Sequence, residues 1–234
     1  MAHFCLPGLS GSRNNLSTMT DPVIIPPTAA HTATVIFLHG LGDTGHGWSS
    51  VFKDEIREPF IKYICPHAPV RPVTLNMGMQ MPAWYDLYGL TPEAEEDVDG
   101  IEESAKLIHS MIDSEVRAGI SSDKIVVGGF SMGGALALYA GLTYDKPLAG
   151  ILGLSSFLIR KDRDCTANKE IPIFMGHGDQ DFLVPLTFGR LTEEYLKKFN
   201  RNVELKVYRG MSHSSCSEEL EDAKQFLLKR LSPK

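Results

Sequence analysis

One serine of this chain lies in a sequence that could make it a nucleophile. Residues 129–133 read Gly-Phe-Ser-Met-Gly, which places Ser131 at the centre of a Gly-x-Ser-x-Gly pattern. The apolar, β-branched run 125–127 precedes this pattern, and the helix-forming run 134–140 follows it. A strand, a glycine turn and a helix in this order hold a serine hydroxyl above the edge of a sheet, near the positive end of the helix. We therefore predict that Ser131 attacks a substrate.

The five-residue pattern alone is weak evidence, because a chain this rich in glycine and serine contains it by chance in roughly one case in seven. The alternative is a glycine turn with an idle serine. A serine hydroxyl is also a poor nucleophile unless a base takes its proton. The prediction therefore depends on whether a base, an acid and donors for an oxyanion occur at suitable places.

The base and the acid can be sought by their order in the chain. Enzymes with a serine on such a turn carry their residues in the order serine, acid, histidine. Only His177 and His213 follow Ser131. His213 lies just past a predicted strand, and Asp179 and Asp181 precede it in another loop that follows a strand. His213 is therefore the predicted base, and spacing alone leaves the choice between the two aspartates open.

A glycine-rich segment could supply the oxyanion donors. The apolar run 34–38 leads directly into His-Gly-Leu-Gly at 39–42, and glycines there allow backbone amides to face a ligand. We predict that the amides of Leu41 and Met132 donate to the oxyanion, an effect worth about 3 kcal/mol per donor. The alternative is a simple connection between a strand and a helix.

The elements that must position these residues alternate along the chain. Apolar runs predict strands at 34–38, 61–65, 125–127, 148–154, 171–175 and 203–207. Helical periods predict helices at 101–116, 134–140 and 188–199 and another from a capping box of Ser215 and Glu218 to Leu231. This alternation predicts an α/β fold with a mostly parallel central sheet and helices on both faces.

Residues 66–90 carry four prolines together with many methionine and aromatic side chains. We expect a loop that lines an apolar pocket, the alternative being ordinary core packing under a long loop. We expect residues 1–30 to form a flexible leader and residues 31–234 to form a single domain.

The composition excludes several other classes of protein. The chain has 234 residues, 43% of them hydrophobic, and a net charge of −6, which disfavours a nucleic-acid partner. No apolar run approaches the about 20 residues that span a bilayer, and the N-terminus lacks the pattern of a secretory signal. Cys5, Cys65, Cys165 and Cys216 are widely spaced, which favours free thiols in a reducing compartment, the cytoplasm. We find no motif for a metal or a cofactor and expect neither.

The motifs together resemble the acyl-protein thioesterase family, the lysophospholipase- and carboxylesterase-like branch of the α/β-hydrolases. The resemblance is carried by 37–48, 63–69, 128–131 with 133–134, His177-Gly178 with Asp181 and 184–185, and Met211 with 213–216. These segments span most of residues 31–231. In this family the acid is the second of the paired positions, which favours Asp181.

The resemblance implies hydrolysis of long-chain S-acyl groups on protein cysteines, or of acyl esters in lysophospholipids. It implies an acyl channel lined by Leu87, Leu90, Phe157 and Leu183, a homodimer, and transient contact with membrane surfaces. The chain departs from the family at Met132, where thioesterases usually carry glutamine. This departure keeps a general carboxylesterase or lysophospholipase with the same triad as the alternative. The family also often has a cysteine directly after the first methionine, whereas the nearest here is Cys5 in a longer leader.

Overall fold

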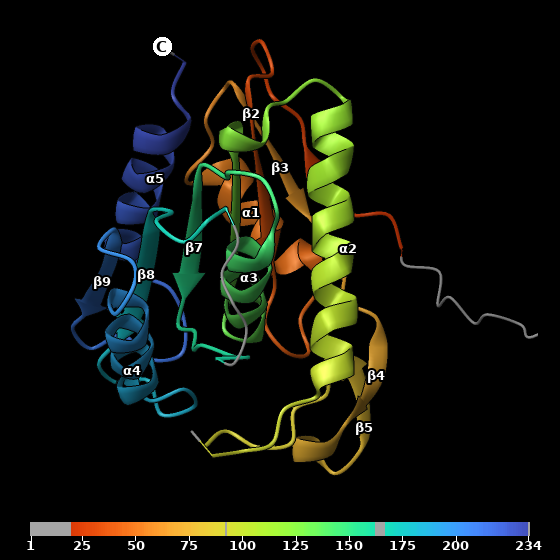
Figure 1. Cartoon of the computed structure of the whole chain (residues 1–234), viewed down its shortest axis with the longest axis vertical. Helices are drawn as coiled ribbons and strands as arrows, with labels where there is room; N and C mark the ends of the chain where they lie inside the picture. Colours follow the sequence, from red (N-terminus) through yellow and green to blue (C-terminus); the bar gives the residue numbers. More distant parts are fainter. Residues whose placement is uncertain (1–19, 92, 162–166, 234) are drawn as a thin grey trace, which may run out of the picture.

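The computed structural model describes residues 20–91, 93–161 and 167–233. Its centre is a seven-stranded sheet in the order β1-β3-β2-β6-β7-β8-β9 (Figure 1). The strands are β1 (Val23–Ile25), β2 (Ala33–Leu38), β3 (Ile61–Cys65), β6 (Ile125–Phe130), β7 (Gly150–Leu154), β8 (Ile173–Gly178) and β9 (Val203–Tyr208). All neighbouring strands pair in parallel except β1, which is antiparallel to β3. The predicted fold class is confirmed.

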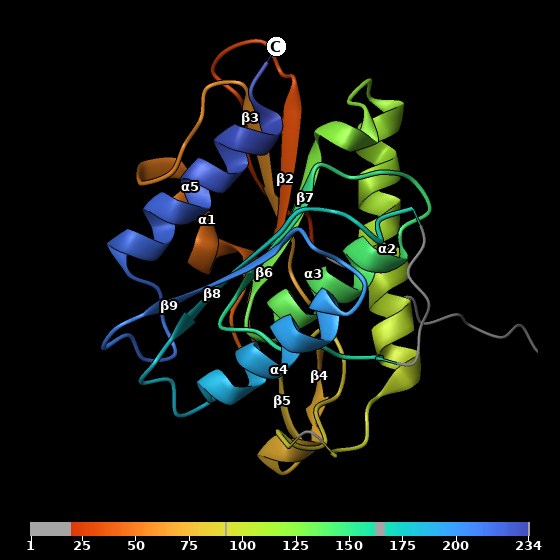
Figure 2. The same cartoon turned by 60° about the vertical axis from the view of Figure 1, so that its left-hand side comes forward.

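Helices cover both faces of this sheet. They are α1 (Gly45–Asp54), α2 (Val98–Arg117), α3 (Met132–Thr143), α4 (Leu186–Lys197) and α5 (Ser217–Leu231), with short 3-10 turns η1 (Thr74–Asn76) and η2 (Ser122–Lys124). Figure 2 shows α1 and α5 on one face and α2, α3 and α4 on the other. Two hydrophobic cores result, because alternate side chains of a strand enter opposite faces. In β2, Ile36 and Leu38 enter the core under α2 and α3, while Val35 and Phe37 enter the core under α1 and α5.

The leader expected at residues 1–30 ends earlier than predicted. Residues 23–25 form β1, in which Val23 lies opposite Cys65 and Ile25 lies opposite Tyr63. Ile25 is buried, so this segment belongs to the domain. A strand of three residues is too short to display an alternating pattern, which is why the sequence did not reveal it. Residues 1–19, and Cys5 with them, lie outside the described residues.

The expected loop at 66–90 contains a small second sheet. β4 (Val70–Val73) and β5 (Met79–Pro82) pair antiparallel around η1. Pro72 and Pro82 are tolerated because a two-stranded ribbon leaves one side of each strand without ladder partners.

Two helices also differ from what the sequence predicts. The sequence did not predict α1, because the start of this helix is rich in glycine. Helix α5 begins after Cys216, which caps it without a side-chain hydrogen bond, so the predicted capping box of Ser215 and Glu218 does not form.

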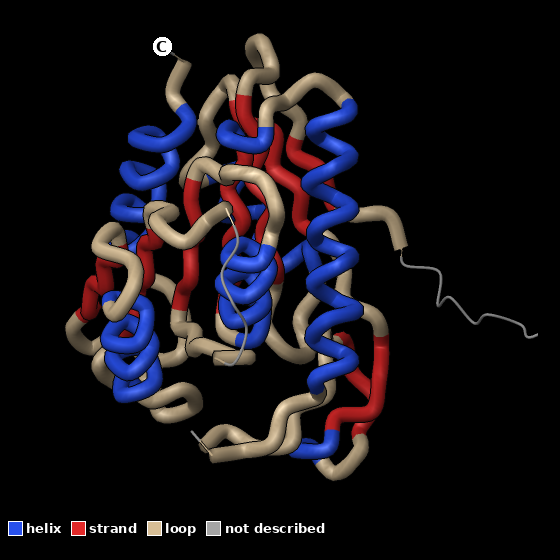
Figure 3. The backbone as a smooth tube through the Cα atoms, viewed as in Figure 1, coloured by secondary structure: helices blue, strands red, loops and turns tan. Residues whose placement is uncertain are grey.

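The parallel arrangement brings the important loops to one edge. β2, β6, β8 and β9 all run in the same direction, so the segments that follow them leave the sheet at its carboxyl edge. Figure 3 shows loops gathered at this end, below the strands. The segment 39–42, Ser131, Asp181 and His213 each follow one of these strands.

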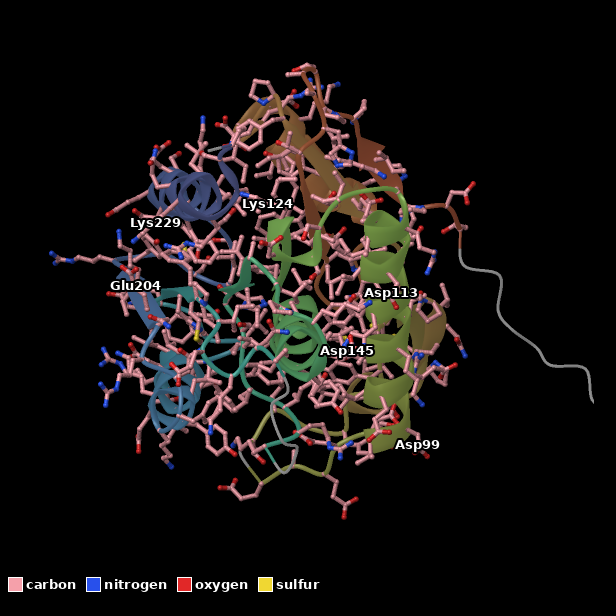
Figure 4. All side chains as sticks on the ribbon, turned by 45° about the horizontal axis from the view of Figure 1, so that its top comes forward. Asp99, Asp113, Lys124, Asp145, Glu204 and Lys229 are labelled. Atoms are coloured by element: carbon pink, nitrogen blue, oxygen red, sulfur yellow. The ribbon has the colours of Figure 1, made fainter. Side chains whose placement is uncertain are left out.

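Charged side chains project from the outer surfaces of the layers. In Figure 4, Glu204 on β9 and Lys229 on α5 lie on one side of the molecule, and Asp99 and Asp113 on α2 lie on the other. None of the described helices combines the length and the apolar character needed to cross a membrane.

Glu219, in the first turn of α5, is a buried carboxyl group. Its side chain is fully inaccessible, and neither oxygen has a hydrogen-bond partner in the part of the chain that the structure describes. The carboxyl packs directly against Gly176 of β8, where a β-carbon would overlap it. Burial, with a smaller effect from the charge of Asp222, raises the pKa of Glu219 to about 8. The group is therefore protonated in the folded protein at neutral pH.

This raised pKa makes the stability depend on pH. The unfolded chain releases the Glu219 proton near pH 4.3, whereas the folded chain keeps it until about pH 8. The free energy of unfolding should fall as pH rises between these values, by on the order of 5 kcal/mol in total. Denaturant unfolding from pH 5 to 9 should show this slope in the wild type and in Glu218→Gln, an exposed neighbour, but a flatter curve in Glu219→Gln. Parallel curves for all three proteins would contradict the buried, protonated state.

Candidate active site

Ser131 lies on a sharp turn between β6 and α3. Its φ of 55° is in the left-handed region, which costs a residue with a side chain on the order of 1–3 kcal/mol. The backbone N–H of Ser131 donates to the carbonyl of Leu154 on β7 at 2.8 Å, which fixes the turn to the sheet. A β-carbon at Gly133 would overlap the carbonyl oxygens of Leu38 and His39, so glycine there lets α3 start directly against the end of β2.

The structure brings Ser131, His213 and Asp181 together. The hydroxyl of Ser131 lies 2.9 Å from Nε2 of His213, and Nδ1 of His213 lies 2.7 Å from Oδ2 of Asp181. Because a carboxylate only accepts, Nδ1 carries the proton and Nε2 is left to accept from the serine. The second carboxylate oxygen, Oδ1, accepts from the backbone amides of Leu183 at 3.0 Å and Val184 at 2.8 Å. Asp181 is 4% exposed, so these bonds hold a nearly buried carboxylate in one orientation.

The two aspartates that spacing left open make different contacts in the structure. Asp181 contacts His213, whereas Oδ1 of Asp179 accepts from the amide of Gly210 at 2.7 Å. His177 is buried and makes no contact with Ser131 that the structure records. Within residues 20–91, 93–161 and 167–233, no three histidine, cysteine, aspartate or glutamate side chains gather closely enough to hold a metal ion.

The segment after β2 lies beside the serine. A β-carbon on Gly40 would lie 3.4 Å from Cβ of Ser131, so the loop approaches the serine closely. Among the described residues, no acceptor engages the amide of Leu41 or that of Met132. Both amides are therefore available to a ligand, and Met132 begins α3, where the helix dipole favours negative charge.

His39 and Trp84 hold this segment, and sequence reasoning assigned neither a role. Nδ1 of His39 donates to the carbonyl of Gly40 at 2.7 Å, and Nε2 accepts from the amide of Ala68 at 3.0 Å. Burial lowers the pKa of His39, which agrees with a neutral ring that donates once and accepts once. The indole of Trp84 donates to the carbonyl of His39 at 2.9 Å.

The bond from His39 also orients the amide of Leu41. The carbonyl of Gly40 and the N–H of Leu41 belong to one trans peptide unit and point in opposite directions. Fixing that carbonyl therefore fixes the direction of the N–H. A sequence pattern cannot reveal this hydrogen bond, because the bond depends on the orientation of the His39 ring after β2.

The structure contains a cavity of about 450 Å³, within the size range of ligand pockets. Its apolar lining includes Leu87, Leu90, Phe157, Phe188 and Leu191. The serine and the histidine of the site do not line it, but Met132 belongs to the same hydrophobic core as Leu87 and Phe157. Leu183 is 65% exposed and is not among the residues that line this cavity.

Comparisons with known proteins agree with this geometry. The model of a phospholipase/carboxylesterase family matches residues 19–231. Acyl-protein thioesterase 1 of Neurospora crassa is 46% identical over 224 residues, covering 90% of this chain and 91% of that protein. Acyl-protein thioesterase 1 of Schizosaccharomyces pombe is also 46% identical, covering 87% and 93%. The crystal structure of acyl-protein thioesterase 2 from Zea mays superposes with a TM-score of 0.82 at 32% identity, covering 90% of this chain and 99% of that chain.

The packing of the serine turn can be tested by adding one methyl group. In Gly133→Ala the new β-carbon meets two backbone carbonyl oxygens that cannot move aside, so we expect a loss of about 3 kcal/mol in unfolding free energy or a failure to fold. Gly89→Ala is the matched control, because its β-carbon approaches only the side chain of Ala94, at 3.2 Å. Urea unfolding of both variants measures the difference. Equal stability of the two would contradict the close approach of α3 to β2.

Proposed function

The chain belongs to the phospholipase/carboxylesterase family, and from this membership we propose that it is a serine hydrolase that removes long-chain acyl groups, palmitoyl above all, from S-acylated protein cysteines. The acyl-protein thioesterases at 46% identity support this substrate class. The observation that carries the mechanism is the hydrogen-bonded series from Ser131 through His213 to Asp181.

The hydrogen-bonded residues Ser131, His213 and Asp181 carry out the reaction in two steps. His213 takes the proton from Ser131 as the serine oxygen attacks the thioester carbonyl, and the imidazolium then gives this proton to the leaving cysteine thiolate. Water attacks the resulting acyl-serine by the same route and releases the fatty acid. Asp181 keeps the imidazole in the tautomer that accepts at Nε2 and stabilises the imidazolium.

The oxyanion of each tetrahedral intermediate is stabilised by two backbone amides. Leu41 and Met132 donate these hydrogen bonds, from the segment held by His39 and from the start of α3. Their orientation is fixed before substrate binds, so little reorganisation is needed as the negative charge develops. Loss of one such donor costs about 3 kcal/mol of transition-state stabilisation.

The acyl chain occupies the cavity lined by Leu87, Leu90 and Phe157. Burial of a methylene group is worth about 0.8 kcal/mol, so each further buried methylene should raise kcat/KM by about fourfold until the cavity is filled. This apolar burial is the basis of the proposed preference for long chains.

The alternative is a general carboxylesterase or lysophospholipase with the same triad. The family description, phospholipase/carboxylesterase, and the methionine at position 132 favour keeping this alternative in the tests. Both activities use the same acyl-serine, so they differ in the leaving group, a thiolate or an alkoxide, and in acyl-chain length.

We also propose that the enzyme works in the cytoplasm and touches membrane surfaces transiently. Phe182 and Leu183, directly after Asp181, are 85% and 65% exposed, and Met77, in the turn between η1 and β5, is 98% exposed. Apolar side chains that stand out beside the site support contact with the lipid surface that holds S-acylated substrates. The homodimer stays a prediction.

Replacing the nucleophile tests the mechanism. Ser131→Ala removes the only group that can form the acyl-enzyme in this mechanism, so kcat should fall by about 10⁴-fold or more while the fold persists. Steady-state hydrolysis of matched thioesters and oxyesters of increasing acyl length checks both this loss and the leaving-group preference. Activity retained in the variant would disprove the mechanism. A wild type that prefers short oxyesters would keep the triad but move the function to the alternative.

Filling the cavity tests where the acyl chain lies. In Leu90→Trp the larger side chain displaces part of a long chain, so kcat/KM for palmitoyl substrates should fall about tenfold, close to two methylene groups losing burial at about 0.8 kcal/mol each. Butyryl substrates should be unaffected. Leu183→Trp is the matched control and should change neither. If only the Leu183 variant loses activity on palmitoyl substrates, the chain lies along the exposed loop instead.

A further inference from the structure

His177 is a buried histidine that the proposed reaction does not use. It lies near the end of β8, four residues before Asp181, and its side chain is fully inaccessible. Its Nε2 lies 2.7 Å from the carbonyl oxygen of Val184 and 3.6 Å from Oδ2 of Asp181. The ring therefore contacts the turn 181–184, which carries the acid of the triad.

The contacts of His177 define its protonation state. The carbonyl of Val184 can only accept, so Nε2 carries a proton. Nδ1 is buried and has no hydrogen-bond partner among the described residues, so a proton there would lack an acceptor. Burial lowers the pKa of His177, opposed by the bond to Val184 and the charge of Asp181, while His213 adds to the lowering. The ring is therefore neutral and donates once, toward the acid turn.

The ring is also held from its other side. A β-carbon at Gly189 of α4 would lie 2.8 Å from Nδ1, so the helix backbone packs directly against the imidazole. Besides Asp181 and His213, the groups that act on the ring among the described residues include the backbone of Gly189 and the carbonyl of Val184, which carry no net charge. With the ring packed in this way, its Nε2–H points in a single direction, toward the carbonyl of Val184.

The hydrogen bond from Nε2 of His177 holds Val184, and Val184 in turn holds the carboxylate of Asp181. Val184 gives its carbonyl to His177, and its own amide donates to Oδ1 of Asp181 at 2.8 Å. Asp181 in turn holds His213 through Oδ2. The hydrogen bonds therefore form a continuous path from the buried strand β8 to the base of the triad.

We propose that His177 is a positioning residue whose neutral Nε2–H clamps the turn 181–184 and thereby sets the orientation of Asp181 toward His213. This inference rests on the proposed function, because it concerns the same triad. Without the clamp, Val184 and the carboxylate can rotate, and the imidazolium of the transition state loses part of its partner. Since His177 does not touch substrate, the effect falls on kcat and leaves KM unchanged.

Two variants separate the clamp from simple packing. His177→Leu fills the space without a donor, and we expect kcat to fall about 10- to 100-fold, as misplacement of catalytic groups by about 1 Å does, with KM within about twofold. In His177→Gln the amide nitrogen can take the place of Nε2, so kcat should recover to within a few-fold of wild type.

A matched control and a double variant complete the test. Ile173→Val, a buried change on the same strand, should lower stability by about 1 kcal/mol and leave kcat unchanged. In an Asp181→Ala background, His177→Leu should cause no further loss, because its effect passes through the carboxylate. A full additional loss in that background, or a normal kcat in His177→Leu alone, would overturn the proposal. An active Ser131→Ala would instead contradict the proposed function itself, so the two failures are distinguishable.

Discussion

The close approach of α3 to the end of β2 is the constraint on which the site depends. Gly133 packs against the carbonyls of Leu38 and His39, which leaves no room for a side chain. This contact holds Ser131 at a φ of 55° and places it at the carboxyl edge of the sheet, directly after β6. It also brings the amide of Met132 beside the segment that carries Leu41. One packing constraint thus brings together the proposed nucleophile and the two amides that we propose as oxyanion donors.

A second principle of the structure is that buried polar groups orient the residues that react. His39 and Trp84 fix the oxyanion segment, and His177 fixes the turn that carries Asp181. Burial lowers the pKa of both histidines, so each ring stays neutral and donates in one direction. The reacting side chains lie on loops, but these loops are bonded to strands and to a buried indole. Such support keeps catalytic geometry within the narrow limits that rate acceleration requires.

The sequence predicted those parts of the fold that long apolar patterns specify. The buried strand β2 and the helix α2 were visible because their patterns are strong. β1 was too short to show a period, and β8 extends through Gly176, His177 and Gly178, which do not favour strands by themselves. The ribbon of β4 and β5 was hidden by its prolines.

The residues of the site divide in a similar way. The Gly-x-Ser-x-Gly pattern led to Ser131 and chain order led to His213. Spacing left Asp179 and Asp181 open until the hydrogen bonds to His213 and Gly210 separated them. The positions of His39 and Leu183 depend on how rings and loops turn in three dimensions. A sequence pattern carries no information on such turns. Residues of this kind can be assigned only once the backbone is placed.

Trapping the acyl-enzyme tests the central claim most directly. The protein would be mixed with an S-palmitoylated peptide, quenched with acid within the first turnover, digested and examined by mass spectrometry. The proposed mechanism predicts a palmitoyl group attached to Ser131, absent when His213 is replaced by alanine. A palmitoyl group on another residue, or turnover of the peptide without any acylated protein, would contradict it.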